Sequence, residues 1–409
     1  FIRCAKFIFL FEKSNTFFIT LITLFCTFGF HIIRKQMKSY LSLIAFSFFL
    51  ASGCAQENTP AIETPTVVNY TYETLVGDIN IPWGMAFIGE NELLVTEISG
   101  TLYHVLNGVK TSIEGLPEIY TRGQGGLLDV ALHPDFKNNN IIYMTLAATL
   151  EGDEGGNTAL YQAKLVAHQL EDVKLLYKAT PNTKKGQHFG SRIAFDSDGH
   201  VYFSVGDRGN RDENPQDITR DGGKIYRLNL DGSIPEDNPF VSNSEAKQAV
   251  FSYGHRNPQG MAVHPKTGAI WVNEHGPQGG DEINVISKGK NYGWPLITYG
   301  INYSGTPITD KTTDPNMEQP LYYWVPSIGP SGMAFSTSDV YADWKDNLFV
   351  GSLKFEYLER LVIEGGDKIV KREKVLDKIG RVRNVKEGPD GFLYVAVEGK
   401  GILKVVPKG

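Results

Sequence analysis

The sequence predicts an all-β protein, a six-bladed β-propeller with four-stranded antiparallel blades. From residue 90 onward one pattern recurs six times. Each copy has turn residues followed by an alternating strand that ends in small or polar residues. A second strand-like phrase precedes each copy. A β-sandwich with similar hairpins is the alternative, although sandwiches rarely repeat such specific phrases. A seven-bladed ring would need a seventh copy, and the sequence contains six.

The N-terminal residues are predicted to lie outside the propeller. The first methionine is Met37, and we interpret residues 1–36 as upstream sequence that is not normally translated, although their apolar run is long enough to span a membrane. Residues 37–53 resemble the signal of a bacterial lipoprotein, which predicts export to the periplasmic side and a lipid anchor at Cys54. Residues 54–66 are rich in Pro and Thr without an apolar period, which predicts a disordered tether.

The propeller is predicted over residues 67–409. Residues 67–76, VVNYTYETLV, are expected to add a strand to the last blade and so close the ring. The six repeated phrases are ENELLVTEISGTLYHV from Glu90, NNNIIYMTLAA from Asn138, DGHVYFSVGD from Asp198, TGAIWVNEHG from Thr267, DNLFVGSLK from Asp346 and DGFLYVAVEGKGILKVV from Asp390.

The phrases before these copies are predicted to form the inner strand of each blade. They read IPWGMAFI, GLLDVALHP, SRIAFD, PQGMAVHP, PSGMAFS and RVRNVKEGP. The alternation within a copy is typical of a strand. In the third copy Val201, Phe203 and Val205 would face one way, while Tyr202 and Ser204 would face the other.

The composition describes a globular protein without a nucleic-acid partner. The chain has 409 residues, of which 41% are hydrophobic and 21% charged, so it can bury a large core. Its net charge of −6 and the absence of a long basic run argue against nucleic acid and favour a small-molecule substrate. The cysteines, Cys4, Cys26 and Cys54, all precede the propeller, so its body has neither a disulfide nor a thiolate metal site.

Loops that enter the inner strands of a propeller meet at one end of its central channel. His188, in KKGQHFGSR, lies in such a loop, but a lone histidine there is most often a surface residue. The polar residues of these loops are Gln124, His188, Arg256, Asn257, Ser327, Lys354, Arg381 and Arg383. Any one cation could simply pair with a carboxylate such as Asp207 or Glu356. Four cations around one histidine need anionic partners, because unpaired buried charges are costly. The set therefore predicts a polyanionic ligand.

A second polar group lies in NEHGPQGGDEIN, which GKNYGWP follows. Asp281 and Glu282 offer carboxylate oxygens, and Gly276 and Pro277 lie in a turn that can expose carbonyls, which is a mixture that calcium accepts. Asp-rich turns are usually only turns, and the spacing of an EF-hand is absent. The histidines of this region lack the paired spacing of zinc ligands.

Five phrases in order resemble the soluble quinoprotein glucose/sorbosone dehydrogenases, especially their aldose sugar dehydrogenase branch. They are GQGGLLDVALHPDF, GDRGNRDENPQD, GHRNPQGMA, EHGPQGGDEIN and NYGWP, and the resemblance runs from about Ile81 to Val406. It implies a six-bladed propeller that holds pyrroloquinoline quinone (PQQ), a tricarboxylate, with calcium at the quinone. The tricarboxylate would be the polyanion that the cations predict.

The resemblance also implies roles for single residues. His188 corresponds to the general base, Asp207 to the acid that orients it, and Arg256 to a catalytic residue that also contacts the cofactor. The implied cofactor contacts are Gln124, Arg256, Asn257, Lys354, Arg381 and Arg383. Gln187 replaces an acid of the glucose dehydrogenase branch and His275 replaces a glutamine, so a preference for glucose is not implied.

The metal residues follow from the same resemblance. The carbonyls of Gly276 and Pro277 correspond to the ligands of the calcium beside the quinone. Glu282 and Tyr292 correspond to a second, structural calcium site.

The implied reaction is the oxidation of a small-molecule aldose at its anomeric carbon to a lactone. The base would remove the hydroxyl proton while hydride passes to the quinone, and the electrons would go on to an external acceptor. Two other classes stay open. A calcium-dependent lactonase would have no reason to keep cations for a tricarboxylate, and a binding propeller would not need His188, Arg256 and Lys354 together.

Overall fold

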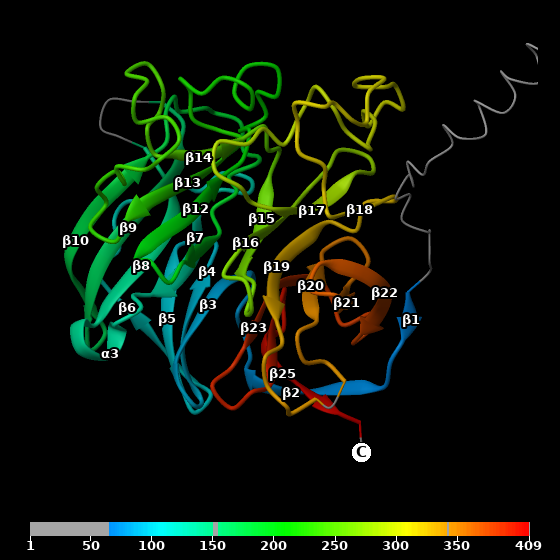
Figure 1. Ribbon diagram of the computed structural model, residues 1–409. Coiled ribbons are helices and arrows are strands. Elements are labelled where there is room, and N and C mark those ends of the chain that lie inside the picture. Colours follow the sequence, from blue (N-terminus) through cyan, green and yellow to red (C-terminus); the bar gives the residue numbers. More distant parts are fainter. Residues whose placement is uncertain (1–64, 150–153, 342, 409) are drawn as a thin grey trace, which may run out of the picture. The chain divides into compact units, whose positions relative to one another are not determined.

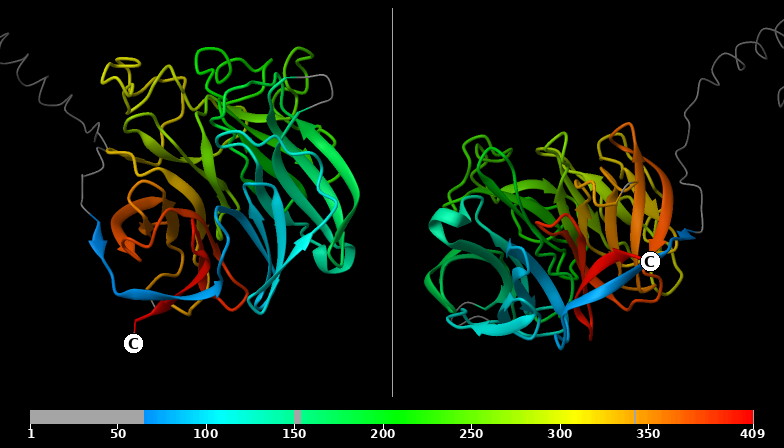
Figure 2. Two further views of the ribbon diagram at one scale, coloured as in Figure 1. Left: turned by 180° about the vertical axis from the view of Figure 1, so that it is seen from behind. Right: turned by 90° about the horizontal axis from the view of Figure 1, so that it is seen from below.

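The computed structural model describes residues 65–149, 154–341 and 343–408. Within these ranges the strands form six antiparallel sheets of four strands each, one of which carries a short fifth strand. The sheets lie around a ring as the blades of a propeller (Figures 1 and 2). The predicted all-β, six-bladed fold is confirmed.

The blades, from the inner to the outer strand, take up the chain in order. Blade 1 has β3 (Pro82–Gly89), β4 (Glu92–Glu97), β5 (Thr101–Leu106) and β6 (Val109–Ile113). Blade 2 has β7 (Leu127–Leu132), β8 (Ile141–Ala148), β9 (Asn157–Val166) and β10 (Gln169–Lys178), with a short helix α3 (Phe136–Asn139) after β7. Blade 3 has β11 (Ile193–Phe195), β12 (His200–Val205), β13 (Lys224–Asn229) and β14 (Val250–Tyr253).

The remaining blades repeat this pattern. Blade 4 has β15 (Pro258–Val263), β16 (Ile270–Glu274), β17 (Asp281–Val285) and β18 (Tyr322–Trp324). Blade 5 has β19 (Pro330–Phe335), β20 (Leu348–Ser352), β21 (Tyr357–Glu364) and β22 (Lys368–Val375). Blade 6 has β23 (Val382–Glu387), β24 (Leu393–Val397), β25 (Gly401–Pro407) and β2 (Tyr70–Val76). Each predicted inner-strand phrase therefore forms the innermost strand of its blade.

The N-terminal strand closes the ring as predicted. β2 pairs antiparallel with β25, so the first strand of the sequence completes the last blade. The single strand expected over residues 67–76 is instead two, because β1 (Thr66–Val67) pairs parallel with β22 of blade 5 before the chain crosses to blade 6. A strand must break where its hydrogen-bonding partner changes.

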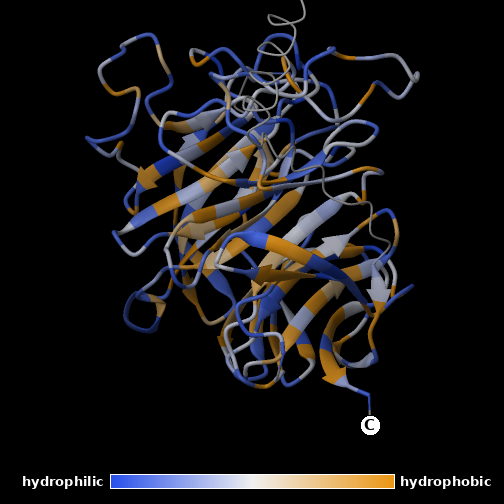
Figure 3. Ribbon diagram, turned by 45° about the vertical axis from the view of Figure 1, so that its right-hand side comes forward, coloured by the Kyte–Doolittle hydropathy of each residue, from blue (hydrophilic) through white to orange (hydrophobic). Residues whose placement is uncertain are grey.

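The hydrophobic core lies between neighbouring blades. Six clusters of buried residues each join two adjacent blades around the ring. The predicted alternation of β12 is confirmed, because Val201, Phe203 and Val205 pack toward blade 2 while Tyr202 packs toward blade 4. Figure 3 shows apolar residues concentrated on the strands. Both faces of a blade are thus buried, and the ring stays closed by packing.

One arginine binds across the central channel. Arg192, which precedes β11, is 2% exposed, and its guanidinium stacks 3.9 Å from the ring of Trp83. It donates to the carbonyls of Trp83 (3.3 Å), Gln259 (2.9 Å) and Arg383 (3.3 Å) and to the carboxylate of Asp129 (3.2 Å). Through this side chain, blade 3 is joined to the inner strands of blades 1, 2, 4 and 6.

The predictions for residues 1–36, for the signal at 37–53 and for the tether up to residue 64 fall outside the described residues and stay predictions. In the described part of the chain, no helix combines the length and apolar character needed to cross a bilayer.

Candidate functional site

Polar residues from several blades meet around a cavity of about 330 Å³. The long loops between β12 and β13 and between β17 and β18, which lie at the top of Figure 1, carry part of its lining. It is lined by Gln187 and His188 before β11, by Asp207 after β12, by Arg256 before β15, and by Trp294 and Tyr303 between β17 and β18. Loops far apart in the sequence therefore build one pocket, as the propeller fold predicts.

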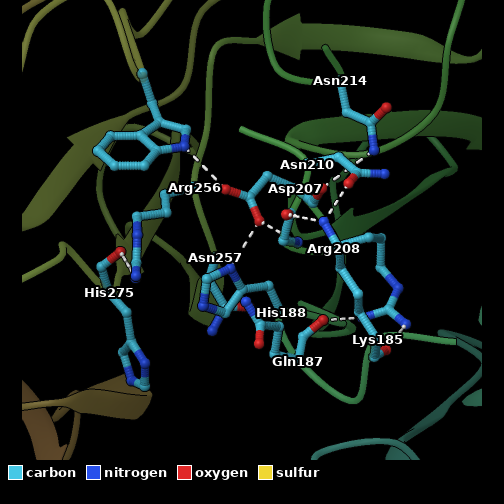
Figure 4. A network of polar contacts seen from close by, with 12 residues as sticks. Lys185, Gln187, His188, Asp207, Arg208, Asn210, Asn214, Arg256, Asn257 and His275 are labelled. Carbon is cyan, nitrogen blue, oxygen red and sulfur yellow. Dashed lines mark hydrogen bonds and ion pairs between the residues drawn. The ribbon is translucent and has the colours of Figure 1, made fainter. Parts of the chain in front are cut away.

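The centre of this pocket is a histidine–carboxylate pair (Figure 4). His188 Nδ1 lies 2.6 Å from Asp207 Oδ1, and the two side chains are 13% and 1% exposed. Trp294 Nε1 donates to Asp207 Oδ2 at 2.9 Å, and the Gly209 N–H donates to Oδ1 at 2.7 Å. Because the carboxylate holds Nδ1, the other ring nitrogen is left for a ligand. His188 is therefore not an ordinary surface histidine.

The backbone of His188 is held in a left-handed conformation. Its φ is 55°, which costs a residue with a side chain about 1 kcal/mol or more. The His188 N–H donates to Gln124 Oε1 at 2.8 Å. A Cβ at Gly206 would lie 2.4 Å from the His188 carbonyl oxygen, so only glycine fits there. Gln124, predicted as a cofactor contact, here fixes the histidine.

The protonation states follow from this burial. Burial lowers the pKa of His188, Asp207 raises it, and Arg256 lowers it further, with a net shift downward. Burial alone would raise the pKa of Asp207, but His188, the charge of Arg256 and the Gly209 N–H together outweigh it, so the pKa is lowered. At neutral pH the pair is thus a neutral imidazole beside an ionised carboxylate, the form of a general base.

Arg256 lies beside the histidine pair. Its Nη1 donates to the carbonyls of Gly276 (2.6 Å) and His275 (3.1 Å), and its main-chain N–H donates to Glu274 (2.7 Å). Its guanidinium lies 5.3 Å from the ring of Trp294. The buried Nε of Arg256 has no hydrogen-bond partner in the protein. Such a donor is open to an acceptor from a ligand, although Arg208 and Arg360 also have a buried Nε without a partner.

Asn257 presents a second donor of this kind. Its Oδ1 accepts from the Gly190 N–H at 3.2 Å, but its buried Nδ2 has no partner. The neighbouring His275 does not share this feature, because its Nε2 donates to the Pro330 carbonyl at 2.7 Å. Burial, then the charge of Arg256, lowers the pKa of His275 to about 3, so its ring is neutral.

The turn at Gly276 and Pro277 is fixed by a buried carboxylate. Asp281 accepts hydrogen bonds from the Gly276 and Gly329 N–H groups, both at 2.8 Å. The Pro277 carbonyl accepts from Ser327 Oγ at 3.3 Å. Pro277 lines the large pocket, so its turn borders the histidine pair. Asp281 holds the turn and is therefore a structural residue.

Arg256 also lines a smaller cavity of about 10 Å³. Glu274, Gly276, Glu282 and Tyr292 line it. Burial, together with the charge of Glu274, raises the pKa of Glu282 well above its usual range. The hydroxyl of Tyr292 is already bonded to the protein, so only its main chain could reach a metal. No group of three or more His, Cys, Asp or Glu side chains in the described residues forms a metal cluster.

Comparison with known proteins settles the family. The model of the glucose/sorbosone dehydrogenase family matches residues 79–404. The chain belongs to this family. The aldose sugar dehydrogenase YliI of Escherichia coli (strain K12) is 41% identical over 355 residues, covering 84% of this chain and 94% of that protein. The quinoprotein glucose dehydrogenase B of Acinetobacter calcoaceticus is 28% identical, covering 81% and 86%.

Solved structures of glucose/sorbosone dehydrogenases have the same fold. The apo-form of the soluble aldose sugar dehydrogenase of Escherichia coli aligns with a TM-score of 0.79 and 40% identity, covering 83% of this chain and 100% of that one. The PQQ-bound form of the aldose sugar dehydrogenase of Streptomyces coelicolor aligns with a TM-score of 0.68 and 26% identity, covering 84% and 100%. The family and its relatives support an oxidoreductase.

The four predicted cations differ in their surroundings. Arg381 and Arg383 each bond one oxygen of Glu398, a residue that follows β24 and that sequence reasoning missed. Of the four cations only Arg256 lines the pocket, while Lys354 is exposed and has no carboxylate within ion-pair distance in the described residues. One carboxylate thus serves two arginines, so this group keeps a net positive charge.

Trp294 was another residue without a predicted role. It lies in the phrase NYGWP, and its indole N–H completes the hydrogen bonding of Asp207. A tryptophan donor can be paired with an acid only once the fold is known, because the two residues are 87 positions apart.

Proposed function

We propose that the protein oxidises aldose sugars at the anomeric carbon to the lactone, with bound PQQ as oxidant and an external acceptor for the electrons. The observation that carries this proposal is the buried His188–Asp207 pair beside Arg256 in the large pocket. It is supported by relatives named a quinoprotein glucose dehydrogenase and a PQQ-bound aldose sugar dehydrogenase.

The residues present fit an anionic, carbonyl-rich cofactor. Two of the buried donors without partners, Arg256 Nε and Asn257 Nδ2, suit the oxygens of such a group. Lys354 is exposed and has no ion-pair partner in the described residues, so its charge is available to an anion. The residues that would hold PQQ are Gln124, Arg256, Asn257, Lys354, Arg381 and Arg383. PQQ, when bound, would supply the acceptor for the hydride.

The protein's own groups would do the proton chemistry. His188 Nε2 takes the proton of the anomeric hydroxyl, and Asp207 stabilises the imidazolium that forms. Trp294 and the Gly209 N–H keep the carboxylate oriented. The Arg256 charge favours negative charge that develops in the pocket. The walls hold these groups in place before the substrate arrives, so little reorganisation is needed.

The first test is direct. Purified protein mixed with calcium and PQQ should gain a quinone-reduction absorbance change when an aldose is added, and none when the sugar's anomeric hydroxyl is blocked as a glycoside. Hydrolysis of a lactone without any absorbance change would favour a lactonase. Quinone binding without turnover on any aldose would favour a binding propeller.

Calcium is the proposed metal at two places. The carbonyls of Gly276 and Pro277 would face one ion beside the cofactor, and Glu282 with the main chain of Tyr292 would face a second. The raised pKa of Glu282 fits a divalent cation, which would relieve the repulsion from Glu274.

We expect chelation to abolish quinone-dependent turnover and calcium to restore it better than magnesium, because flexible carbonyl and carboxylate ligation suits the larger ion. Calcium should also raise the melting temperature of the quinone-free protein. The control is Glu282→Gln, in which that thermal shift should shrink. Full activity after exhaustive chelation would reject the metal.

The pH profile gives a separate prediction. A general base must be neutral, and burial lowers the pKa of His188 below its ordinary value of 6.5. We therefore expect kcat/KM to be constant at neutral pH and to fall as the pH drops through an inflection below 6.5. Assays of aldose-dependent quinone reduction over a pH series would measure this dependence of kcat/KM on pH. An inflection above 6.5 would contradict the neutral, buried histidine.

A further inference from the structure

A buried cation next to the histidine pair has no part in the proton chemistry above. Arg208 follows Asp207, is 0% exposed, and has no carboxylate within ion-pair distance in the described residues. Burial lowers the pKa of Arg208 to about 9, so its guanidinium stays protonated at neutral pH. Burying a charge without an ion-pair partner is costly, so the side chain needs strong compensating contacts.

Those contacts are main-chain carbonyls. Arg208 Nη1 donates to the carbonyl of Gln187, and Nη2 donates to those of Lys185 (2.9 Å) and Gly156 (3.3 Å), while the buried Nε has no partner in the protein. The guanidinium also lies 3.3 Å from the ring centroid of Phe189. An aliphatic side chain could cover Phe189 without the cost of a buried charge, but it could not bind three carbonyls.

Arg208 contacts the residues on either side of the candidate base, and Figure 4 shows it beside Gln187 and Lys185. Gln187 precedes His188 and Phe189 follows it. Arg208 therefore contacts the chain on both sides of the histidine, through the Gln187 carbonyl and the Phe189 ring. Asp207, the residue before Arg208, is hydrogen-bonded to the imidazole ring itself. Two consecutive residues of one loop thus fix both the ring and the backbone of His188. The left-handed φ of His188 persists only if its surroundings hold it.

We propose that Arg208 is a positioning residue that fixes the His188 loop so that the imidazole stays aligned on Asp207. This inference rests on the proposed role of His188 as the base. Arg208 touches no reacting atom, and its effect passes through the main chain of residues 185–189.

The charge of Arg208 also acts on the histidine. The charged and titratable groups that share the pocket with His188 or act on its charge are Lys185, Asp207, Arg208, Arg211, Asp212, Glu213, Arg256, His275 and Tyr303. Both arginines lower the pKa of His188, while Asp207 raises it. Removal of the Arg208 charge should therefore raise this pKa, whereas a lysine at the same position should leave it nearly unchanged.

The activity test compares Arg208→Met and Arg208→Lys in protein loaded with calcium and PQQ. We expect kcat to fall about 100-fold in Arg208→Met, the usual cost of a misplaced catalytic group, and about 10-fold in Arg208→Lys, which keeps the charge but loses the planar fork. The matched control is Arg227→Met, which removes another buried arginine of blade 3 that pairs with Asp237 and Asn238. Its kcat per folded molecule should stay within about twofold.

The second readout does not need the cofactor. In quinone-free protein with labelled histidines, the ring signals of His188, assigned by their absence in His188→Gln, are titrated by NMR. We expect a raised pKa in Arg208→Met and a wild-type value in Arg208→Lys. If Arg208→Met does not fold, the kcat of Arg208→Lys decides the proposal. An unchanged His188 titration together with unchanged kcat would overturn it. Failure of the wild type to oxidise any aldose would reject the proposed function. The titration would still test whether Arg208 acts on His188.

Discussion

His188→Gln is expected to lower turnover by about two to four powers of ten, the usual scale for losing a positioned general base. Glutamine can still bond Asp207 and fill the space, but it cannot accept the proton of the anomeric hydroxyl at neutral pH. The cofactor contacts predicted at Arg256, Asn257 and Lys354 are untouched, so PQQ affinity should stay nearly intact. The loss should appear in kcat, because the removed interaction acts in the transition state.

The measurement is a pair of titrations on the variant, one of quinone affinity and one of aldose-dependent reduction. The matched control is His200→Gln. His200 and Asp196 form a similar pair at the other end of β12, with Nδ1–Oδ2 at 2.8 Å and exposed fractions of 17% and 14%. This control should keep full turnover. Retained reduction in His188→Gln would refute the base, and lost quinone affinity would make His188 a cofactor contact instead.

The fold was predictable because its signals are local. Each blade carries its own alternation and turn, and the period of two in β12 alone places Phe203 and Tyr202 on opposite faces. The number of repeats then gives the number of blades. The break between β1 and β2 was not predictable, since nothing in a run of alternating residues marks a change of partner strand.

The candidate site was only partly predictable, because its electrostatics depend on partners distant in the sequence. The resemblance implied that Asp207 orients His188, and the structure places Asp207 Oδ1 2.6 Å from His188 Nδ1. It could not be inferred that Glu398 pairs with both Arg381 and Arg383, because a carboxylate's partners depend on how blade 6 packs. The same holds for Arg208, whose ligands are carbonyls and so leave no signature in residue types.

The largest expected loss of stability comes from Arg192, at the centre of the ring. Its guanidinium bonds Asp129 and the carbonyls of Trp83, Gln259 and Arg383, which belong to four other blades. Arg192→Met keeps the apolar stem over Trp83 but leaves Asp129, 1% exposed, as a buried charge without its partner. Breaking a buried pair in this way costs about 3–5 kcal/mol of unfolding free energy.

Denaturant titration of the wild type and variants would measure this loss. In the double variant Arg192→Met with Asp129→Asn, part of the stability should return, because the uncompensated charge is gone. The matched control is Lys266→Met, which breaks an exposed pair with Asp346 whose side chains are 64% and 32% exposed, and it should cost less than about 1 kcal/mol. If Arg192→Met costs no more than Lys266→Met, the guanidinium does not hold the blades together and packing alone closes the channel. If it does cost several kcal/mol, the charge is retained there because one flat, five-donor group can satisfy carbonyls that converge from several strands at once.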